Sequence, residues 1–281
     1  MWTHENRPKY NRDHLRYPSD LTDDEWAHVE LLIPPAKPGG GKRRTDMRAV
    51  MNGVMYILST GCQWRYLPKD FPPRSTVHDY FKLWEWDGTL ERIHFTLFVW
   101  VRELAGKEAS PTAAIIDSQS VKSAERGGAE IDPIGYDAGK KVKGIKRHIV
   151  VDTLGMILIG QIQPASVQDR DGALPVLAEA RRLFTFIKKI FADGGYQGEA
   201  TATAVALIGH WELEIVKRSD TAKGFVVLPK RWIVERTFAW LGRCRRLSKH
   251  VENLTRSALA FLRLAMIRLM MRRIARLQLQ Q

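Results

Sequence analysis

The sequence predicts an α/β fold in which a mixed β-sheet is flanked by helices and preceded by an all-helical N-terminal domain. Residues 1–107 carry only helical patterns, whereas short apolar runs typical of strands begin after Pro111 and then alternate with helical stretches. The length of 281 residues suits two ordinary domains. We therefore expect a helical domain over residues 1–107, and an α/β domain with a long C-terminal helix over residues 108–281.

The composition is that of a globular protein with a polyanionic partner. Apolar residues make up 44% of the chain and charged residues 27%. Lys and Arg total 44 against 31 for Asp and Glu, a formal charge of +13, which favours nucleic acid or an anionic membrane. No apolar run reaches the roughly 18 residues of a membrane span, and no signal peptide is visible. We expect a cytoplasmic, nucleoid-associated protein without a membrane partner.

A first helix is predicted to begin at Thr22. Thr22 and Glu25 form a capping box, in which each side chain accepts a hydrogen bond from the backbone N–H of the other residue. Pro34 and Pro35 end the helical pattern, because proline cannot continue a helix. A Gly-rich, basic linker over residues 37–44 follows.

Three further helices are predicted before residue 107. Thr45 is expected to cap a helix that closes at Gly61, Ser75 a helix that runs to Gly88, and residues 90–104 form a fourth. Short capped helices with a basic approach are typical of a helix-turn-helix module, and a helical subdomain that only packs is the alternative. If this region binds DNA, the expected contacts are Arg43, Arg44, Ser75 and His78.

The pattern after Pro111 predicts strands alternating with helices. Residues 112–117 form a buried strand ending in Asp117, and residues 148–152 and 156–162 form a hairpin around Gly155. The expected order then is a helix over 173–186, a strand over 187–192, a helix over 200–208, a strand over 213–216, a helix over 232–247 and a helix over 254–277. A hairpin followed by crossover helices implies a mixed sheet. This order is the one expected for an RNase H-like fold.

Three carboxylates are the candidate catalytic residues. Asp117 and Asp193 each end a predicted strand, and neighbouring parallel strands bring such ends to one rim of a sheet. Two close carboxylates repel unless a cation lies between them, so the pair indicates a hard divalent metal such as Mg²⁺. Glu235 is the expected third ligand, on a helix whose same face carries Arg231 and Arg243, suited to a phosphate backbone.

Each carboxylate also has a structural interpretation. Asp117 could cap a turn, Asp193 could be an ordinary turn aspartate before two glycines, and Glu235 could be a surface residue paired with an arginine. The combination of all three with the fold order favours catalysis. Of the other acids, Asp152 fits a hairpin turn, while Asp169 and Asp171 fit the start of a helix from residue 173, a fourth carboxylate near the metals being the lesser alternative.

Basic residues near these carboxylates are candidate DNA contacts. The run over residues 140–147 precedes a strand and could neutralise phosphates or be a solvated loop. Arginines recur every four residues on the last helix, where a solvated face is the alternative to DNA contact. Trp232 is expected to be core rather than a stacking platform. The expected contacts in this half of the chain are Lys140, Lys143, Lys146, Arg147, Arg231, Arg236 and Arg243.

Three motifs resemble the DDE transposases of bacterial insertion sequences, and most closely the insertion-sequence-five family. They are Ile-Ile-Asp-Ser at Asp117, Ala-Asp-Gly-Gly-Tyr at Asp193 and Arg-Trp-Ile-Val-Glu-Arg at Glu235. Residues 17–26, 61–68 and 231–249 also resemble that family. The sequence departs from the wider pattern, because Leu228 stands where a Tyr is expected and Gly242 where a Lys is expected. Arg243 is the expected substitute for the Lys.

The resemblance implies a transposase that binds the terminal inverted repeats of an insertion sequence, cleaves DNA at its ends and joins them to target DNA. It implies that Asp117, Asp193 and Glu235 bind two Mg²⁺ ions, with Mn²⁺ as a substitute, and that a homodimer acts on double-stranded DNA, both element ends and target. Two alternatives stay open. One is an RNase H-like Mg²⁺ nuclease without strand transfer, and the other is a non-catalytic helix-turn-helix DNA-binding regulator.

Overall fold

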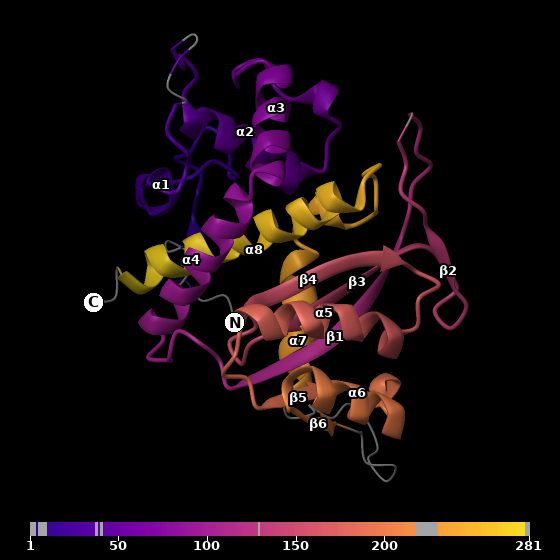
Figure 1. Ribbon diagram of the computed structural model, residues 1–281. Helices are drawn as coiled ribbons and strands as arrows, with labels where there is room; N and C mark the ends of the chain where they lie inside the picture. The colour runs from indigo at the N-terminus through magenta and orange to yellow at the C-terminus, as the bar shows by residue number, and fades with distance from the viewer. Residues whose placement is uncertain are drawn as a thin grey trace.

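The N-terminal part of the chain is helical, as the sequence predicts (Figure 1). The computed structural model describes residue 4 and residues 10–36, 39, 42–128, 130–216 and 230–278. The elements described in this part are α1 (Asp23–Glu30), α2 (Met47–Thr60), the 3₁₀ turn η2 (Trp64–Tyr66), α3 (Arg74–Trp86) and α4 (Thr89–Leu104). The predicted basic linker lies partly outside the described residues.

The capping signals of the first two helices are largely confirmed. Thr22 caps α1 through the complete capping box, with both hydrogen bonds to Glu25 measuring 3.2 Å. Gly61 ends α2 with a φ of 70°, a left-handed conformation that glycine adopts without strain. The cap of α2 is Asp46 rather than Thr45, because the Asp46 carboxylate accepts from two backbone N–H groups of the first turn.

The prediction that Ser75 caps the third helix is wrong. α3 begins at Arg74, its cap is Pro73, and no side chain bonds to its first turn. Proline suits a helix start because its φ is fixed and it has no N–H to leave unpaired. Ser75 therefore lies exposed within the first turn.

A mixed six-stranded sheet forms the second half of the described chain. Its strands run in the order β2-β3-β1-β5-β6, with β4 also paired to β3. β3 is antiparallel to β1, β2 and β4, whereas β1, β5 and β6 are parallel. This topology confirms the predicted RNase H-like fold. The strands are β1 (Ala113–Lys122), β2 (Gly135–Asp137), β3 (Val142–Val151), β4 (Ile157–Pro164), β5 (Lys189–Ala192) and β6 (Glu212–Ile215).

The first two long strands extend further than predicted. β1 continues five residues beyond Asp117, and β3 begins at Val142, inside the run predicted to be a basic loop. The two strands pair without interruption from Ile115 opposite Val151 to Lys122 opposite Gly144. Long-range backbone pairing therefore decides where these strands end, and the apolar pattern of each segment alone does not show it.

Helices cover both faces of the sheet (Figure 1). α5 (Asp169–Leu183) packs on β3, β4 and β1 on one face, and α6 (Glu199–Gly209) contacts α5 and β6. α7 (Arg231–Leu241) packs on β1, and α8 (Thr255–Gln278) packs on β4, α4 and α7. α8 also contacts α1, α2 and α3, so it lies between the N-terminal helices and the sheet.

The predicted helix over residues 232–247 is shorter in the structure. α7 ends at Leu241, and the segment continues as the 3₁₀ turn η4 (Arg245–Leu247). Gly242 follows the last helical residue, and glycine disfavours continued helix because of its backbone freedom. The helix predicted from residue 173 begins earlier, at Asp169, so Asp169 and Asp171 lie in its first turn. A second 3₁₀ turn, η3 (Gly194–Tyr196), follows β5.

The hydrophobic core is continuous between the N-terminal helices and the sheet. It includes Leu97 and Val101 of α4 together with Leu262 and Met266 of α8. The division at residue 107 therefore stays a prediction. Within the residues that the structure describes, no helix combines the length and the apolarity needed to cross a bilayer.

Candidate active site

Asp117 and Asp193 lie close together on neighbouring parallel strands. The last paired residues of the β1–β5 ladder are Ile115 and Phe191. Asp117 lies two residues after Ile115, and Asp193 lies two residues after Phe191, so both carboxylates are at the same edge of the parallel pair. The predicted strand-end position is correct for Asp193 but not for Asp117, which lies inside β1 because that strand continues along β3.

The backbone fixes one oxygen of each aspartate. Asp117 Oδ1 accepts from the N–H of Ser118 at 2.7 Å, and Asp193 Oδ1 accepts from the N–H of Gly195 at 2.8 Å. Burial, with the negative charge of Asp193 added to it, raises the pKa of Asp117 to about 7. The ionised form of Asp117 is therefore destabilised unless a cation lies nearby.

Glu235 lies on α7, and Arg231 links its carboxylate to that of Asp193. The Arg231 Nε lies 3.2 Å from Glu235 Oε1, and its Nη2 lies 3.5 Å from Asp193 Oδ2. Two carboxylates therefore share one guanidinium. The Glu235 side chain is 52% exposed.

The chemistry of the donors fits a hard divalent cation. Carboxylate oxygens are the ligands that Mg²⁺ prefers in proteins, and the backbone bonds use Oδ1 of both aspartates. In the part of the chain that the structure describes, no three His, Cys, Asp or Glu side chains lie close enough to hold a metal ion together. At this site the Arg231 guanidinium stands between Asp193 and Glu235.

A polar cluster forms around the side chain of Ser118, the residue after Asp117. Ser118 Oγ donates to Asp169 Oδ1 at 2.6 Å, and Lys146 Nζ lies 2.8 Å from the same oxygen. Burial raises the pKa of the Tyr196 hydroxyl well above its usual value, with the charges of Asp117 and Asp169 adding to the effect. The sequence interpretation placed Asp169 at a helix start and gave Tyr196 no role. The only sequence signal for Tyr196 was its place in the Asp-Gly-Gly-Tyr motif. The only signal for Asp169 was the alternative of a fourth carboxylate near the metals.

Lys146 and Arg147 are not in an exposed basic loop. Both lie within β3 and are nearly buried, at 4% and 3% exposure. Lys146 pairs with Asp169 and Asp137, and burial lowers the pKa of Arg147 to about 10. The loop prediction is wrong because pairing with β1 and β4 draws this basic segment into the sheet.

The other predicted DNA contacts occupy three separate regions: the start of β3, the N-terminal part of the chain, and α7 with the residues just after it. Lys140 is exposed just before β3 and Lys143 is exposed within it, and Lys140 Nζ lies 3.9 Å from Asp169. In the N-terminal part of the chain, Arg43, between α1 and α2, donates to the carbonyl of Pro34, and His78 of α3 is half-buried against Trp64. Arg44 and Ser75 are exposed in that same part of the chain.

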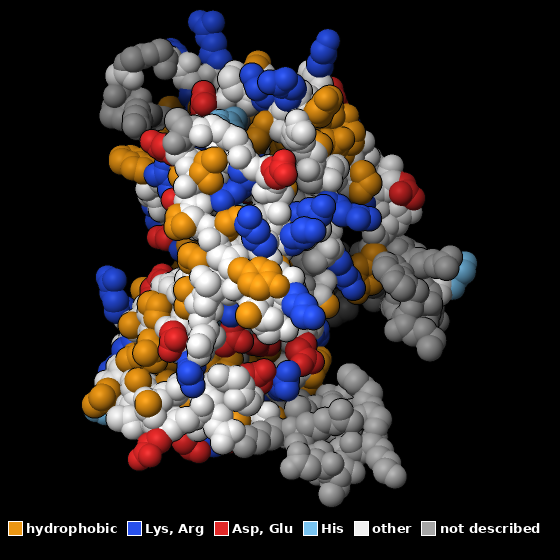
Figure 2. All heavy atoms as spheres, turned by 90° about the vertical axis from the view of Figure 1, so that its right-hand side faces the viewer, with side chains coloured by type: hydrophobic (Ala, Val, Ile, Leu, Met, Phe, Trp, Pro, Cys, Tyr) orange, Lys and Arg blue, Asp and Glu red, His pale blue; other side chains and the backbone are white. Residues whose placement is uncertain are grey.

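Arg236 lies on α7, and Arg243 lies just after the end of that helix. The Arg236 guanidinium lies 4.3 Å from the centre of the Trp232 ring and 4.5 Å from that of Trp240. Trp232 is 39% exposed, so the prediction that it belongs to the core is wrong. Figure 2 shows acidic side chains gathered in the middle of one face, with Lys and Arg side chains beside and above them.

The sequence matches a family model described as the transposase DDE domain over residues 108–270, more than half of the chain. The chain belongs to this family of DDE transposases. A second model, described as "Putative transposase of IS4/5 family", matches residues 21–94. The predicted family and enzyme class, a DNA transposase of an insertion sequence, are thereby confirmed. Members of this family generally use divalent metal ions.

Two relatives of this transposase come from Burkholderia cepacia. The chain is 32% identical over 114 residues to "Insertion element IS402 uncharacterized 16.2 kDa protein", covering 38% of this chain and 76% of that one. It is 31% identical over 128 residues to "Putative transposase for insertion sequence element IS402", covering 43% and 60%. A solved structure titled as a pre-cleavage Mos1 transpososome aligns over 88% of this chain and 82% of its own, at 9% identity and a TM-score of 0.33. That score is too low to establish a shared fold.

Proposed function

We propose that this transposase binds the terminal inverted repeats of an insertion sequence, cleaves DNA at its ends and joins them to target DNA. Asp117, Asp193 and Glu235 would hold two Mg²⁺ ions, for which Mn²⁺ can substitute. The observation that carries the proposal is the pair of aspartates on adjacent parallel strands, with the pKa of Asp117 raised to about 7 by burial and by its neighbour. The two negative charges of such a pair repel each other, and a bound cation offsets this repulsion.

The bound ions would activate the attacking hydroxyl and stabilise the leaving oxygen of a phosphodiester. The protein side chains position the reacting groups. β1 and β5 hold the two aspartates by backbone pairing and by hydrogen bonds to Ser118 and Gly195. Glu235 would complete the ligand set, with the Arg231 guanidinium displaced from between the two carboxylates. Arg231 is then available to a DNA phosphate, which guanidinium groups bind in a bidentate manner.

The partner in this proposal is double-stranded DNA, both element ends and target, and a homodimer pairs two ends. The formal charge of +13 supports a polyanionic partner. The exposed predicted contacts remain proposals for this role. They are Arg43, Arg44, Ser75, Lys140, Lys143 and Arg243.

The test is a joining assay with purified protein. DNA carrying candidate element ends would be incubated with an acceptor plasmid, in Mg²⁺, in Mn²⁺ and in EDTA. Asp193→Ala would be the active-site variant and Asp171→Ala the matched control, because Asp171 is an exposed aspartate in the first turn of α5. We expect metal-dependent joined products from the wild type and the control, and none from Asp193→Ala.

Other results would select the alternatives. Cleavage without joining would indicate the RNase H-like nuclease. Tight binding without metal-dependent cleavage would indicate the regulator. Equal activity of Asp193→Ala and wild type would contradict the assigned metal site.

A further inference from the structure

A groove lined by arginines runs between the end of α7, the β3–β4 turn and the second half of α8. Its volume is about 530 Å³, and Trp240, Leu154 and Leu269 form apolar parts of its wall. None of its lining residues is acidic. Half of them are arginines, namely Arg236, Arg243, Arg268, Arg272, Arg273 and Arg276.

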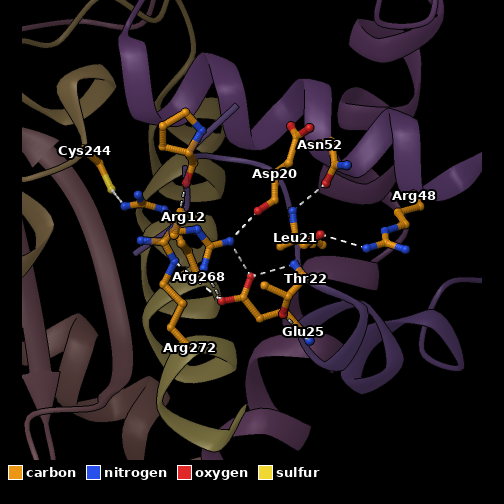
Figure 3. Close-up of polar contacts among 11 residues, drawn as sticks. Arg12, Asp20, Leu21, Thr22, Glu25, Arg48, Asn52, Cys244, Arg268 and Arg272 are labelled. Atoms are coloured by element: carbon orange, nitrogen blue, oxygen red, sulfur yellow. Dashed lines mark hydrogen bonds and ion pairs between the residues drawn. The ribbon is translucent and has the colours of Figure 1, made fainter. Parts of the chain in front are cut away.

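The protein neutralises this charge only in part. Glu25 lies 3.8 Å from Arg272, but the same carboxylate is held by Arg12 at 2.7 Å (Figure 3). Asp152, the other carboxylate whose charge reaches the groove, is paired with Arg102. Among the described residues, the buried Nε atoms of Arg236, Arg268 and Arg272 have no hydrogen-bond acceptor. The six arginines and the absence of acidic lining residues therefore give the groove a positive charge that favours an anion.

The arrangement of these arginines suits a polymer of phosphates. Arg268, Arg272 and Arg276 follow one another every four residues on α8, so they stand about 6 Å apart along the helix axis. The row spans about 12 Å, roughly the length of three or four nucleotides of one strand at about 3.4 Å each. A single small anion would engage only part of such a row.

The groove is lined in part by α7, the helix that carries Glu235. Arg236 is the residue next to Glu235, and its guanidinium donates to the carbonyl of Leu154 at the groove wall. Trp240 lies five residues after Glu235, about 7.5 Å further along α7. Measured along the axis of α7, this separation equals about two nucleotide spacings of about 3.4 Å each.

We propose that this arginine groove binds the backbone of the DNA duplex whose phosphodiester lies at Asp117 and Asp193. This inference rests on the proposed function. In this proposal Arg268, Arg273 and Arg276 contact DNA phosphates and do not merely form a solvated helix face. The contact is to phosphates, so it strengthens binding without selecting sequence.

The test is DNA binding without metal, so that it does not depend on cleavage. A labelled blunt duplex of mixed sequence would be titrated in EDTA over a series of salt concentrations. The groove variant is Arg243→Gln/Arg273→Gln/Arg276→Gln, which spares Arg272 because that residue bonds to Pro18 and Glu25. The matched control is Arg181→Gln/Arg182→Gln/Lys188→Gln, which removes the same charge from α5 and the loop after it.

The expected result is a weaker salt dependence in the groove variant alone. Each lost phosphate contact lowers the slope of log K against log salt by about 0.9, so the slope should fall by about two to three. The Arg181→Gln/Arg182→Gln/Lys188→Gln control should keep the slope of the wild type. Arg243→Lys/Arg273→Lys/Arg276→Lys should restore most of it, and thermal melting should show all variants folded.

Three outcomes would overturn the inference or separate it from the proposed function. An unchanged slope in the folded groove variant, or an equal loss in the control, overturns the groove while metal-dependent joining still stands. If the groove variant loses folding, the single variant Arg273→Gln decides, with an expected loss of about 0.9 in slope. Groove-dependent binding in a protein that never cleaves DNA would support the groove and overturn the transposition mechanism.

Discussion

The guanidinium of Arg231 lies 3.2 Å from the Glu235 carboxylate, one helical turn away on α7, and also contacts Asp193. It thus occupies the space between two of the three proposed metal ligands. A positive charge at this place offsets carboxylate repulsion in the absence of metal, and it competes with a metal ion for the same oxygens.

Arg231→Gln should tighten metal binding and weaken the reaction on DNA. Removing a competing charge a few ångströms from the ligands should improve Mn²⁺ affinity by about fivefold, equivalent to about 1 kcal/mol. Free Mn²⁺ measured by electron paramagnetic resonance during a titration gives the affinity directly. Arg182→Gln, on α5, is the control. An Mn²⁺ affinity equal to that of the wild type would contradict competition by Arg231.

Asp117→Asn should stabilise the metal-free protein in alkaline but not in acidic solution. Burial raises the pKa of Asp117 to about 7 in the folded protein, so ionisation of this group opposes folding. Stability is lost as the pH rises from the unfolded value near 3.8 through about 7, and the asparagine avoids that loss. The gain should be on the order of 2–4 kcal/mol above pH ~7 and vanish below pH ~4.

Urea unfolding at several pH values measures this gain. Adding Mg²⁺ above pH ~7 should stabilise the wild type and leave Asp117→Asn unchanged, since a ligand that binds only the folded form raises its stability. A constant difference between the two proteins across the whole pH range would refute the ionisation argument.

Glu25→Gln should destabilise the contact between the N-terminal segment and α8. Burial alone would raise the pKa of Glu25, but the hydrogen bond and charge of Arg12, together with Arg272, lower it (Figure 3). The group therefore contributes stability above the unfolded pKa near 4.5, and this contribution disappears as the pH falls through the folded value. Breaking one partner of a buried pair typically costs about 3–5 kcal/mol.

Denaturant unfolding near neutral pH tests the Glu25 prediction. The control is Asp23→Asn, whose side chain is 93% exposed and should change stability by less than about 1 kcal/mol. Equal effects of the two substitutions would show that the buried pair contributes nothing special.

Arg102→Met should destabilise the joint between α4 and the β3–β4 turn. Arg102 pairs with Asp152, and the two side chains are 5% and 0% exposed. Its loss leaves a buried carboxylate without a partner, at a cost of about 3–5 kcal/mol. Burial raises the pKa of Asp152 even with Arg102 in place, so the loss should shrink in acid as Asp152 takes up a proton. Thermal unfolding beside the exposed control Arg92→Met measures the effect, and similar melting of the two variants would contradict it.

Local signals in the sequence predicted several elements well. Thr22 and Glu25 form the predicted capping box, and Gly61 ends α2, because both signals act through bonds within a few residues. They were less reliable where proline set the helix start, as at Ser75, and where a helix continued by one more turn, as at Asp169.

The sequence by itself determined the order of helices and strands apart from the short strand β2, together with the RNase H-like class and the transposase family. It also gave the three carboxylates as candidates, because their motifs are short and local. Only the tertiary structure decided which basic residues stay exposed. Lys146 and Arg147 are drawn into β3 by pairing with distant strands, whereas arginines of α7 and α8 meet in one groove. Burial and charge clustering depend on contacts between residues far apart in the chain, so the spacing of residues within one segment cannot predict them.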